Sequence, residues 1–306
     1  MMAVERGEAS PKGSRKPSSQ TSENAQKVLA AFIDRRKPYI WMLNAFGFER
    51  RVIVDVQGIS AVISGGASGL GLSAARRLAT RGVFVVLLDL PASRGEDMAR
   101  ELGAAARFVP GDVRDEAAVE EAVAAAAAVA PLRVAVACAG TATAHKTVGR
   151  NGPAPIDGFA DTLTINVVGT FNLIRLAAAE MAKLDPVGGE RGVVVATASI
   201  AAYDGQRGQA AYAAAKGGIV AMTLPVARDL APLKIRMMTV APGIFDTPIL
   251  DGLTPAQVAT LREQVPHPAR LGAADEFAAL VEHIVDNPML NGETIRIDAA
   301  VRLGTK

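Results

Sequence analysis

The sequence predicts an α/β fold of the Rossmann type, a doubly wound parallel sheet in a single domain with a small substrate-loop region. Three observations predict it. From residue 52 onward, short β-rich runs alternate with helical stretches. A glycine-rich turn lies between the first of these runs and the first helix. Half of the chain is hydrophobic although few residues are aromatic, a composition that suits buried parallel strands beneath alanine-rich helices.

The β-rich runs that predict the sheet recur along the whole of this region. In chain order they are 61–64, 83–88, 107–109, 134–138, 193–198, 235–241 and 294–297. The helical stretches between them include 70–80, 116–129 and 210–230. Gly82 follows the first helix, where a C-cap is expected. This alternation predicts βαβ units, so helices should cover both faces of a parallel sheet.

The first 51 residues differ from the rest in charge and composition. They contain ten Lys or Arg and five Asp or Glu, an excess of +5. The whole chain has a net charge of +2, so the remaining 255 residues carry a charge of −3. That mild acidity gives no support for a nucleic-acid surface. Residues 1–24 are rich in Ser, Pro, Lys, Glu and Gln, and we expect 1–51 to be a largely disordered extension of a domain spanning 52–306. Apolar residues at helical spacing in 25–50 leave open a short amphipathic helix that rests on a partner, although an appended segment without a part in the chemistry is favoured.

Cysteine, histidine and hydropathy patterns indicate the redox compartment and whether a metal or a membrane takes part. Cys138 is the only cysteine, which excludes an internal disulfide and favours a reducing, cytoplasmic compartment. His145, His267 and His283 have no acidic or cysteine partners at ligand spacing, so we expect no metal site. No uninterrupted apolar run reaches the roughly 20 residues that cross a bilayer. We therefore expect neither a metal nor a membrane to take part.

The glycine-rich turn at 64–71, SGGASGLG, follows a strand and opens a helix. Glycine is needed where a backbone turns sharply and approaches phosphate oxygens, and the amino end of a helix attracts an anion. The turn therefore predicts a seat for a dinucleotide pyrophosphate. A glycine-rich turn alone is not specific, but this one has the required strand before it and helix after it.

Asp89 ends the next strand, 18 residues beyond Gly71. A carboxylate at this point can accept hydrogen bonds from the adenosine ribose and repels a 2′-phosphate. The turn contains no Arg or Lys to neutralise such a phosphate, so NAD is favoured over NADP. Asp112 and Val113 follow the third strand, where they can meet the adenine edge, although Asp112 can equally be a turn residue.

Tyr212 and Lys216 are four residues apart on the helix expected at 210–230, so they project from one face. A phenol has a pKa of about 10, and a neighbouring ammonium lowers such a value by about 1–3 units. We therefore expect Lys216 to lower the pKa of Tyr212 into the range of a general acid or base. Ser199 follows the strand at 193–198 and supplies a hydroxyl that can hold a substrate oxygen.

These residues, in this order, resemble the short-chain dehydrogenase/reductase family over nearly all of 56–303. The turn is similar to that family's TGxxxGxG, with Ser64 in place of Thr, and Ser199 and the Tyr212–Lys216 pair resemble its catalytic serine and YxxxK. Asn166 matches the asparagine that completes the family's tetrad and carries a proton-relay water. The resemblance implies that Ser199 orients the substrate oxygen, Tyr212 moves the proton, and Lys216 holds the nicotinamide ribose.

The likeness is closer to one branch of the family, the type 2 3-hydroxyacyl-CoA dehydrogenases, also called 17β-hydroxysteroid dehydrogenase type 10. It rests on GGASGLGL at 65–72, LLDLP at 87–91, GQAAY at 208–212 and KGGIV at 216–220, and on a loop around 146–159. The branch implies NAD-dependent interconversion of a 3-hydroxyacyl-CoA and a 3-ketoacyl-CoA in fatty acid metabolism, by a homotetramer. A dehydrogenase for steroids, 3-ketoacyl-carrier protein or another secondary alcohol is an alternative, and a fold-retaining scaffold is a non-enzymatic one.

The resemblance also implies which residues contact ligands. Those that would contact NAD are Gly65, Ser68, Gly69, Leu70, Gly71, Asp89, Asp112, Val113, Cys138, Ala139, Gly140, Tyr212, Lys216, Pro242, Gly243, Phe245 and Thr247. Those that would contact substrate are Ser199, Gln206 and Tyr212. Three features depart from the family: Ala137 replaces a sheet-bracing asparagine, Asp246 replaces a small residue, and residues 1–51 have no counterpart.

Overall fold

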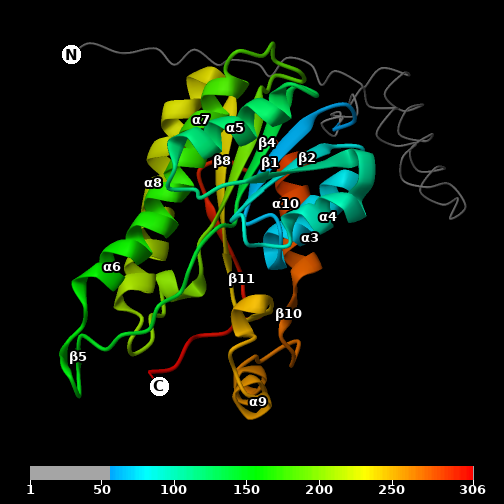
Figure 1. The fold of residues 1–306 in the computed structure, drawn as a ribbon. Helices are drawn as coiled ribbons and strands as arrows, with labels where there is room; N and C mark the ends of the chain where they lie inside the picture. The colour runs from blue at the N-terminus through cyan, green and yellow to red at the C-terminus, as the bar shows by residue number, and fades with distance from the viewer. Residues whose placement is uncertain (1–55, 306) are drawn as a thin grey trace, which may run out of the picture. The chain divides into compact units, whose positions relative to one another are not determined.

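A parallel sheet of seven strands organises residues 56–305, the part of the chain that the computed structural model describes (Figure 1). The strand order is β11-β8-β7-β4-β1-β2-β3, so the winding direction reverses between β1 and β4. The strands of this sheet are β1 (Ser60–Ser64), β2 (Phe84–Asp89), β3 (Ala106–Pro110), β4 (Leu132–Ala137), β7 (Gly192–Thr197), β8 (Ile235–Pro242) and β11 (Thr294–Ile297). The predicted doubly wound sheet is confirmed, whereas the extension predicted at 1–51 lies outside the described residues.

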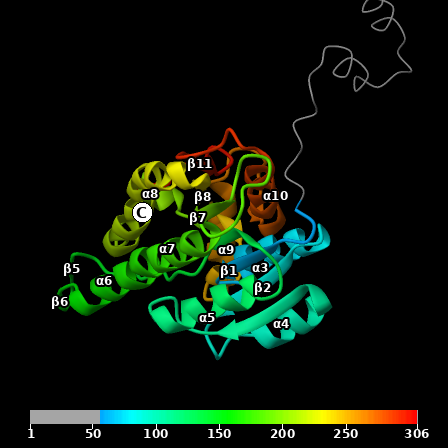
Figure 2. The same cartoon turned by 90° about the horizontal axis from the view of Figure 1, so that it is seen from above.

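Helices cover both faces of the sheet. On one face lie α5 (Glu116–Ala127), α7 (Gly169–Met181) and α8 (Ala210–Leu230), and on the other α3 (Gly69–Thr80), α4 (Gly95–Leu102) and α10 (Ala274–Asp286) (Figures 1 and 2). The shorter helices are η1 (Gly103–Ala105), α6 (Ile156–Leu163), η2 (Thr164–Val168), η3 (Ile200–Ala202), η4 (Ala231–Leu233), η5 (Pro248–Leu250) and α9 (Pro255–Glu263).

The core consists of two layers because side chains of a strand alternate between its faces. In β1, Val62 belongs to the layer beneath α5, α7 and α8, whereas Ala61 and Ile63 belong to the layer beneath α3 and α10. All residues of β1, β7 and β8 are buried. Such strands bury both faces, which explains why they read as continuous apolar runs in the sequence.

The predicted strands and helices lie within a few residues of the observed ones. The helix expected at 210–230 has these bounds, and Gly82 follows the C-cap of α3 with φ of 82°. The sequence reasoning did not predict two small sheets outside the main one. These are the hairpin of β5 (Val148–Gly149) and β6 (Gly152–Pro153), and the parallel pair of β9 (Phe245–Asp246) and β10 (Gly272–Ala273).

Two helical stretches, Ile156–Met181 and Ala210–Leu233, are long and apolar enough to cross a membrane by length and composition alone. Within the apolar 18-residue window of each stretch, 50% and 33% respectively are buried inside the fold. α7 and α8 pack against the sheet, as core helices with the same composition do, whereas α6 packs on α8 and projects to one side (Figure 2). The core therefore accounts for the buried part of these apolar stretches, and their other apolar side chains are exposed on α7 and α8.

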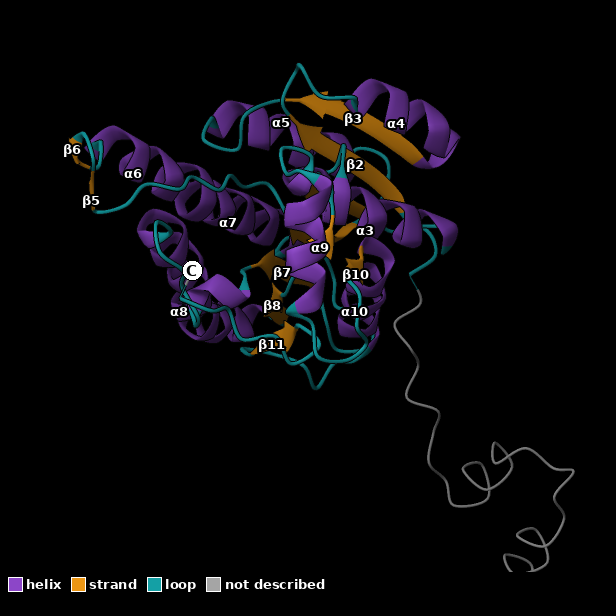
Figure 3. Ribbon diagram, turned by 90° about the horizontal axis from the view of Figure 1, so that it is seen from below, coloured by secondary structure: helices purple, strands orange, loops and turns teal. Residues whose placement is uncertain are grey.

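The carboxyl ends of the parallel strands meet at one edge, where ligands bind in open α/β sheets. Figure 3 looks onto this edge, with α9 in front of the sheet, and α6 with the β5–β6 hairpin projects to one side. The glycine turn, Ser199 and the segment after β8 follow strands that end here, and Asp89 is the last residue of β2. This edge holds the candidate site.

Candidate active site

The glycine turn between β1 and α3 is held in a shape that only glycine allows at two positions. Gly65 has φ of +66°, and a Cβ added to it would lie 2.7 Å from the backbone nitrogen of Ala139. A Cβ on Gly71 would lie 2.2 Å from the carbonyl oxygen of Gly65. Ser68 is the N-cap of α3, yet its side chain makes no capping hydrogen bond. The first amides of the helix are therefore available to an anion, as the predicted pyrophosphate seat requires.

The carboxylate of Asp89 is fixed against this turn. One oxygen accepts a hydrogen bond of 2.9 Å from the amide of Ala67, and the other accepts one of 2.8 Å from the amide of Leu90. Both bonds use backbone donors, so they set the orientation of the carboxylate while leaving lone pairs for further donors. The residue is half-buried, and its position suits a ribose diol placed beside the turn.

Asp112 is a turn residue. It accepts a hydrogen bond of 2.9 Å from the amide of Arg114 and forms an ion pair of 2.6 Å with that guanidinium. The hydrogen bond from the Arg114 side chain lowers the pKa of Asp112. Val113 is buried, and its carbonyl accepts a hydrogen bond of 2.9 Å from Asn172 of α7. Asp112 is therefore observed as a turn residue, one of the two roles considered for it, and a contact with adenine stays a prediction.

Tyr212 and Lys216 project from one face of α8, as predicted, and the ammonium lies 5.8 Å from the centre of the phenol ring. Nζ of Lys216 donates a hydrogen bond of 2.8 Å to the carbonyl of Thr197, the last residue of β7. Lys216 is only 5% exposed, and burial lowers its pKa to about 8. The group is therefore still mostly protonated at pH 7.

The prediction that the pKa of Tyr212 would be lowered is wrong for this structure. Loss of hydration by burial raises the pKa of Tyr212, and the hydrogen bond with Ser199 opposes this rise without cancelling it. The physical reason is that the phenolate loses more from desolvation than it gains from neighbouring donors. The hydrogen bond itself brings Ser199 and Tyr212 together, as the sequence reasoning expected.

Asn166 lies in η2, a π-helical turn between α6 and α7. Its Nδ2 donates hydrogen bonds of 2.9 Å to the carbonyls of Thr141 and Thr162. Its Oδ1 is buried and accepts no hydrogen bond within the described part of the chain. A Cβ on Gly140 would lie 2.5 Å from this oxygen and 3.5 Å from Nζ of Lys216. A buried acceptor without a partner, beside the lysine, is a site for a donor such as an ordered water.

Cys138 forms part of the wall between the turn and Lys216. Its Sγ lies 3.2 Å from Oγ1 of Thr197, and its Cβ would be 3.2 Å from a Cβ on Gly71. Burial raises the pKa of the thiol to about 11. The sulfur is therefore protonated at neutral pH, which fits a small apolar wall and not a nucleophile.

The segment after β8 closes over the glycine turn. Pro242 ends the strand, and the amide of Gly243 donates a hydrogen bond of 2.9 Å to the carbonyl of Ile297. Phe245 is 8% exposed and packs on Gly272 of β10. The side chain of Thr247 lies 3.5 Å from a Cβ placed on Gly69. These residues and the turn thus face each other, as the predicted cofactor site requires, whereas Asp246 is exposed.

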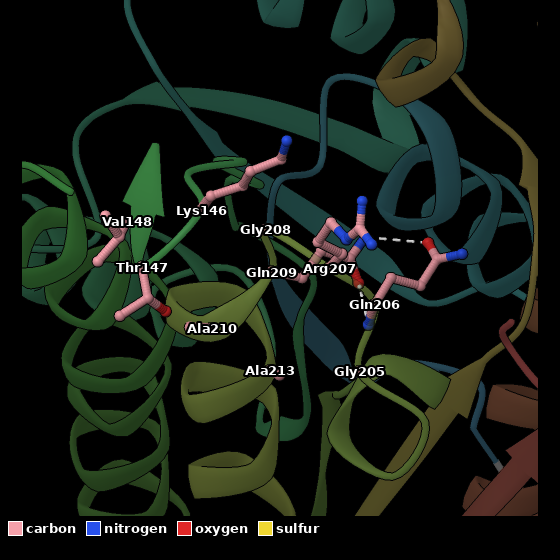
Figure 4. A pocket seen from close by; sticks show the side chains of 10 residues that line it. All are labelled: Lys146, Thr147, Val148, Gly205, Gln206, Arg207, Gly208, Gln209, Ala210 and Ala213. Carbon is pink, nitrogen blue, oxygen red and sulfur yellow. Dashed lines mark hydrogen bonds between the residues drawn. The ribbon is translucent and has the colours of Figure 1, made fainter. Parts of the chain in front are cut away.

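Gln206 lies apart from this cluster, in a cavity of about 530 Å³ beside the amino end of α8 (Figure 4). Its side-chain oxygen accepts a hydrogen bond of 3.4 Å from Gln209. Lys146 and Arg207 also line the cavity, and neither makes a hydrogen bond or ion pair with residues that the structure describes. The cavity reaches Ala213, the residue after Tyr212 on α8, whereas Tyr212 itself does not line it.

The remaining predicted residues lie around the same cluster, and the geometry adds others. Leu70 and Ala139 pack on the core beside the turn, and Ala139 donates a hydrogen bond of 3.4 Å to Oγ of Ser64. Thr197 was missed because a backbone carbonyl leaves no mark in a sequence. Within residues 56–305 no group of three or more His, Cys, Asp or Glu side chains is arranged to hold a metal ion.

Comparison with known proteins decides the family. The sequence pattern described as short chain dehydrogenase matches residues 60–257. The chain belongs to the short-chain dehydrogenase family. As a short-chain dehydrogenase it is an oxidoreductase enzyme, and its fold is that of this family, as the sequence predicted.

Several relatives of this short-chain dehydrogenase are similar over nearly their whole length. It is 52% identical to the human 3-hydroxyacyl-CoA dehydrogenase type-2 over 253 residues, 81% of this chain and 97% of the relative. It is 49% identical to the Drosophila melanogaster protein of the same name, with 81% and 99% covered. The solved structure of 3-hydroxyacyl-CoA dehydrogenase type-2 from Mycobacterium avium is 43% identical, with a TM-score of 0.80, covering 83% of this chain and all of that one.

Proposed function

We propose that this short-chain dehydrogenase uses NAD to interconvert a 3-hydroxyacyl-CoA and a 3-ketoacyl-CoA. The observation that carries the proposal is the cluster of Ser199, Tyr212 and Lys216 beside a glycine turn that can seat a pyrophosphate. The substrate class is supported by the names of relatives that are about half identical over almost their full length.

The cofactor would be held along the whole carboxyl edge of the sheet. The glycine turn and the amino end of α3 would take the pyrophosphate, Asp89 the adenosine ribose, and Lys216 the nicotinamide ribose. Gly243 to Thr247 would cover the nicotinamide. When bound, NAD supplies the hydride acceptor or donor. Asp89 supports NAD as the cofactor because its fixed carboxylate would meet the 2′-phosphate of NADP with a like charge.

Tyr212 is the group that moves the proton. In reduction its hydroxyl gives a proton to the ketone oxygen, and in oxidation its phenolate takes the proton of the alcohol. The raised pKa of Tyr212 keeps the phenol protonated, which is the form that reduction needs. Oxidation needs positive charge nearby, and Lys216, with a pKa of about 8, supplies it at neutral pH.

Ser199 and Asn166 serve the same proton transfer from two sides. Ser199 already hydrogen-bonds Tyr212, so its hydroxyl is placed to bond the substrate oxygen that Tyr212 protonates or deprotonates. The unpaired Oδ1 of Asn166 lies beside Lys216, where it can hold a water that returns the proton to solvent. Each positioned group is expected to contribute to a rate gain of about 10²–10⁴-fold in total.

A cationic cavity at the amino end of the helix that carries Tyr212 supports a substrate with an anionic carrier. Lys146 and Arg207 line this cavity of about 530 Å³ (Figure 4). Coenzyme A carries phosphate groups, which such cations bind, whereas a steroid carries none. The cavity therefore favours an acyl thioester of coenzyme A over the steroid alternative.

A substrate panel tests the proposal. Oxidation of NADH is followed with acetoacetyl-CoA, acetoacetyl-carrier protein, the acetoacetyl thioester of N-acetylcysteamine and a ketosteroid. We expect the highest kcat/KM with acetoacetyl-CoA. Turnover of the steroid, but not of acetoacetyl-CoA, would overturn the proposed substrate class while leaving the oxidoreductase assignment intact.

Matched variants test the part played by the cavity. Replacing both Lys146 and Arg207 by Ala should raise KM for acetoacetyl-CoA about tenfold, since two charge-assisted contacts are lost. The same change should leave kinetics with the N-acetylcysteamine thioester, which has no phosphate, within about twofold. Arg107→Ala, which removes an exposed cation from β3, is the control. Equal effects on both thioesters would contradict the phosphate contact.

We also propose that the enzyme is a homotetramer. Several large apolar side chains are exposed on η2, α7 and α8, among them Val168 at 54%, Phe171 at 46% and Leu224 at 45%. Exposed apolar clusters on helices mark surfaces that bury against a partner. Analytical ultracentrifugation should give four times the mass of the chain, and a monomeric mass would contradict this assembly.

A further inference from the structure

The segment that follows β11 runs across the carboxyl edge of the sheet, beside the candidate site (Figure 1). Arg296, on β11 directly before this segment, is the centre of an ion-pair network. Its Nε lies 2.7 Å from Oδ2 of Asp298, and its Nη2 lies 2.7 Å from Oδ2 of Asp204. The guanidinium also stacks 4.9 Å from the ring centre of Tyr203. Arg296 thus joins the C-terminal segment to the loop after β7.

That loop is the one that carries Ser199. Ser199 is the N-cap of η3, and its Oγ accepts a hydrogen bond of 3.1 Å from the amide of Ala201. The amide of Asp204 donates a hydrogen bond of 2.9 Å to the carbonyl of Ile200. Ser199 and Asp204 are therefore the two ends of one tight turn, and a displacement of Asp204 is transmitted to Ser199 through its hydrogen bonds.

Apolar contacts reinforce the same connection. Ile200, directly after Ser199, is 2% exposed and lies in a small cluster with Val301, which is 1% exposed. Val265 and Leu271, from the segment around α9, belong to this cluster too. The C-terminal segment therefore contacts both the serine loop and the segment around α9.

The segment also supports the nicotinamide side of the site. The carbonyl of Ile297 accepts the amide of Gly243 at 2.9 Å, and a Cβ on Gly243 would lie 2.8 Å from Cα of Asp298. One short stretch of chain thus contacts the elements on both sides of the reacting centre, namely the serine loop and the segment after β8 that closes over the glycine turn.

The backbone of this stretch is strained, and Arg296 helps to hold it. Ala299 and Ala300 have φ of 50° and 63°, a region that side chains other than glycine rarely adopt. Such residues persist only where their surroundings fix them. Here Oδ1 of Asp298 accepts the amide of Ala300 at 3.0 Å, and Nη2 of Arg296 donates to the carbonyl of Val301 at 3.3 Å.

We propose that Arg296 is a positioning residue for Ser199, acting through Asp204, with the turn at 298–301 as its support. The proposal rests on the assignment of Ser199 to the substrate oxygen. Arg296 is suited to this because its planar fork binds Asp204, Asp298 and the Val301 carbonyl at once, and its side chain is only 23% exposed, so water screens the pairs little.

A matched pair of variants separates positioning from general stability. Arg296→Met is compared with Arg81→Met, which removes ion pairs of similar exposure, 22% to 24%, between the C-cap of α3 and Glu282 and Asp286 of α10. Both variants should lower Tm. Only Arg296→Met should lower kcat, by about 10–100-fold, because small misplacements of a catalytic group cost this much. The Kd for NAD, measured by titration calorimetry, should stay within about twofold in both variants.

A double-mutant cycle decides whether Arg296 acts through Ser199. In a Ser199→Ala background, Arg296→Met should lower kcat by less than about threefold, since the group that it positions is already gone. Asp204→Asn, a nearly isosteric change, is taken through the same cycle and keeps the test valid if Arg296→Met does not fold. A loss of kcat that is additive with Ser199→Ala, or an equal loss in Arg81→Met, would overturn the proposal. The cycle uses whichever substrate of the panel the parent turns over, so its outcome is independent of the acyl-CoA assignment.

Discussion

Replacing Asp89 by Asn should weaken the preference for NAD, because the fixed charge of this carboxylate is the feature that discriminates against NADP. Both carboxylate oxygens accept backbone amides, from Ala67 at 2.9 Å and Leu90 at 2.8 Å. Asparagine retains one of these acceptors and removes the charge with almost no change of volume. Asp89→Asn therefore removes the charge together with one acceptor, and both losses enter the expected change.

The magnitude follows from the placement of Asp89 beside the turn. Two unit charges about 4 Å apart near a protein surface repel by about 4 kcal/mol. Asp89 is half-buried, so we take about half of this, roughly 2 kcal/mol, or about 30-fold in kcat/KM for NADP. The variant also loses one acceptor for the ribose, which costs about 1 kcal/mol, or about fivefold with NAD. The ratio of kcat/KM for NAD over NADP should therefore fall by about 100-fold.

Steady-state kinetics with both cofactors at constant ionic strength measures this ratio. Asp97→Asn, which removes an exposed carboxylate from α4, is the control and should leave the ratio unchanged. A ratio in Asp89→Asn within about threefold of the parental one would refute the reasoning, because it would place the 2′-hydroxyl away from this carboxylate.

Three further predictions concern the same site. Gly71→Ala should abolish the NAD-dependent rise in Tm, because the new Cβ would meet the carbonyl oxygen of Gly65 at 2.2 Å; Gly252→Ala, where nothing lies within 4 Å, should preserve it. Cys138, with a pKa of about 11, should react with iodoacetamide at pH 8 at least 100-fold more slowly in the folded protein than in the denatured chain; equal rates would contradict the raised pKa. Lys216 should make stability rise with pH between about 8, its folded pKa, and about 10.5, because there the unfolded chain holds a proton that the native one has lost. The shift corresponds to about 3 kcal/mol, so Tm of the parent should rise relative to Tm of Lys216→Met across this window, and parallel profiles would contradict the pKa.

The fold was predictable because its signals are local. Strands such as β7 and β8 are buried on both faces and appear as continuous apolar runs, and Gly82 marks the end of the first helix. The β9–β10 pair was not predictable, since each strand has two residues and they are brought together by the closure of a distant segment. Nor does the sequence reveal that η2 is a π-helical turn, or that Oδ1 of Asn166 is buried without a partner among the described residues.

The candidate site was predictable in its residues and not in its energetics. Spacing alone put Tyr212 and Lys216 on one helix face, and charge proximity then suggested a lowered phenol pKa. The structure reverses the direction because burial raises the pKa of Tyr212 by more than the hydrogen bond with Ser199 lowers it, and burial depends on residues from several distant segments. Arg296 was missed for the same reason, since Asp204 is 92 residues away and no motif joins them.

The central claim, that the Tyr212 hydroxyl moves the proton, is tested most directly by Tyr212→Phe. This change removes one oxygen and keeps the ring that packs beside Lys216. We predict that kcat falls by at least about 100-fold in both directions of the reaction while the Kd for NAD stays within about threefold. A variant that binds NAD and turns over at the parental rate would contradict the account.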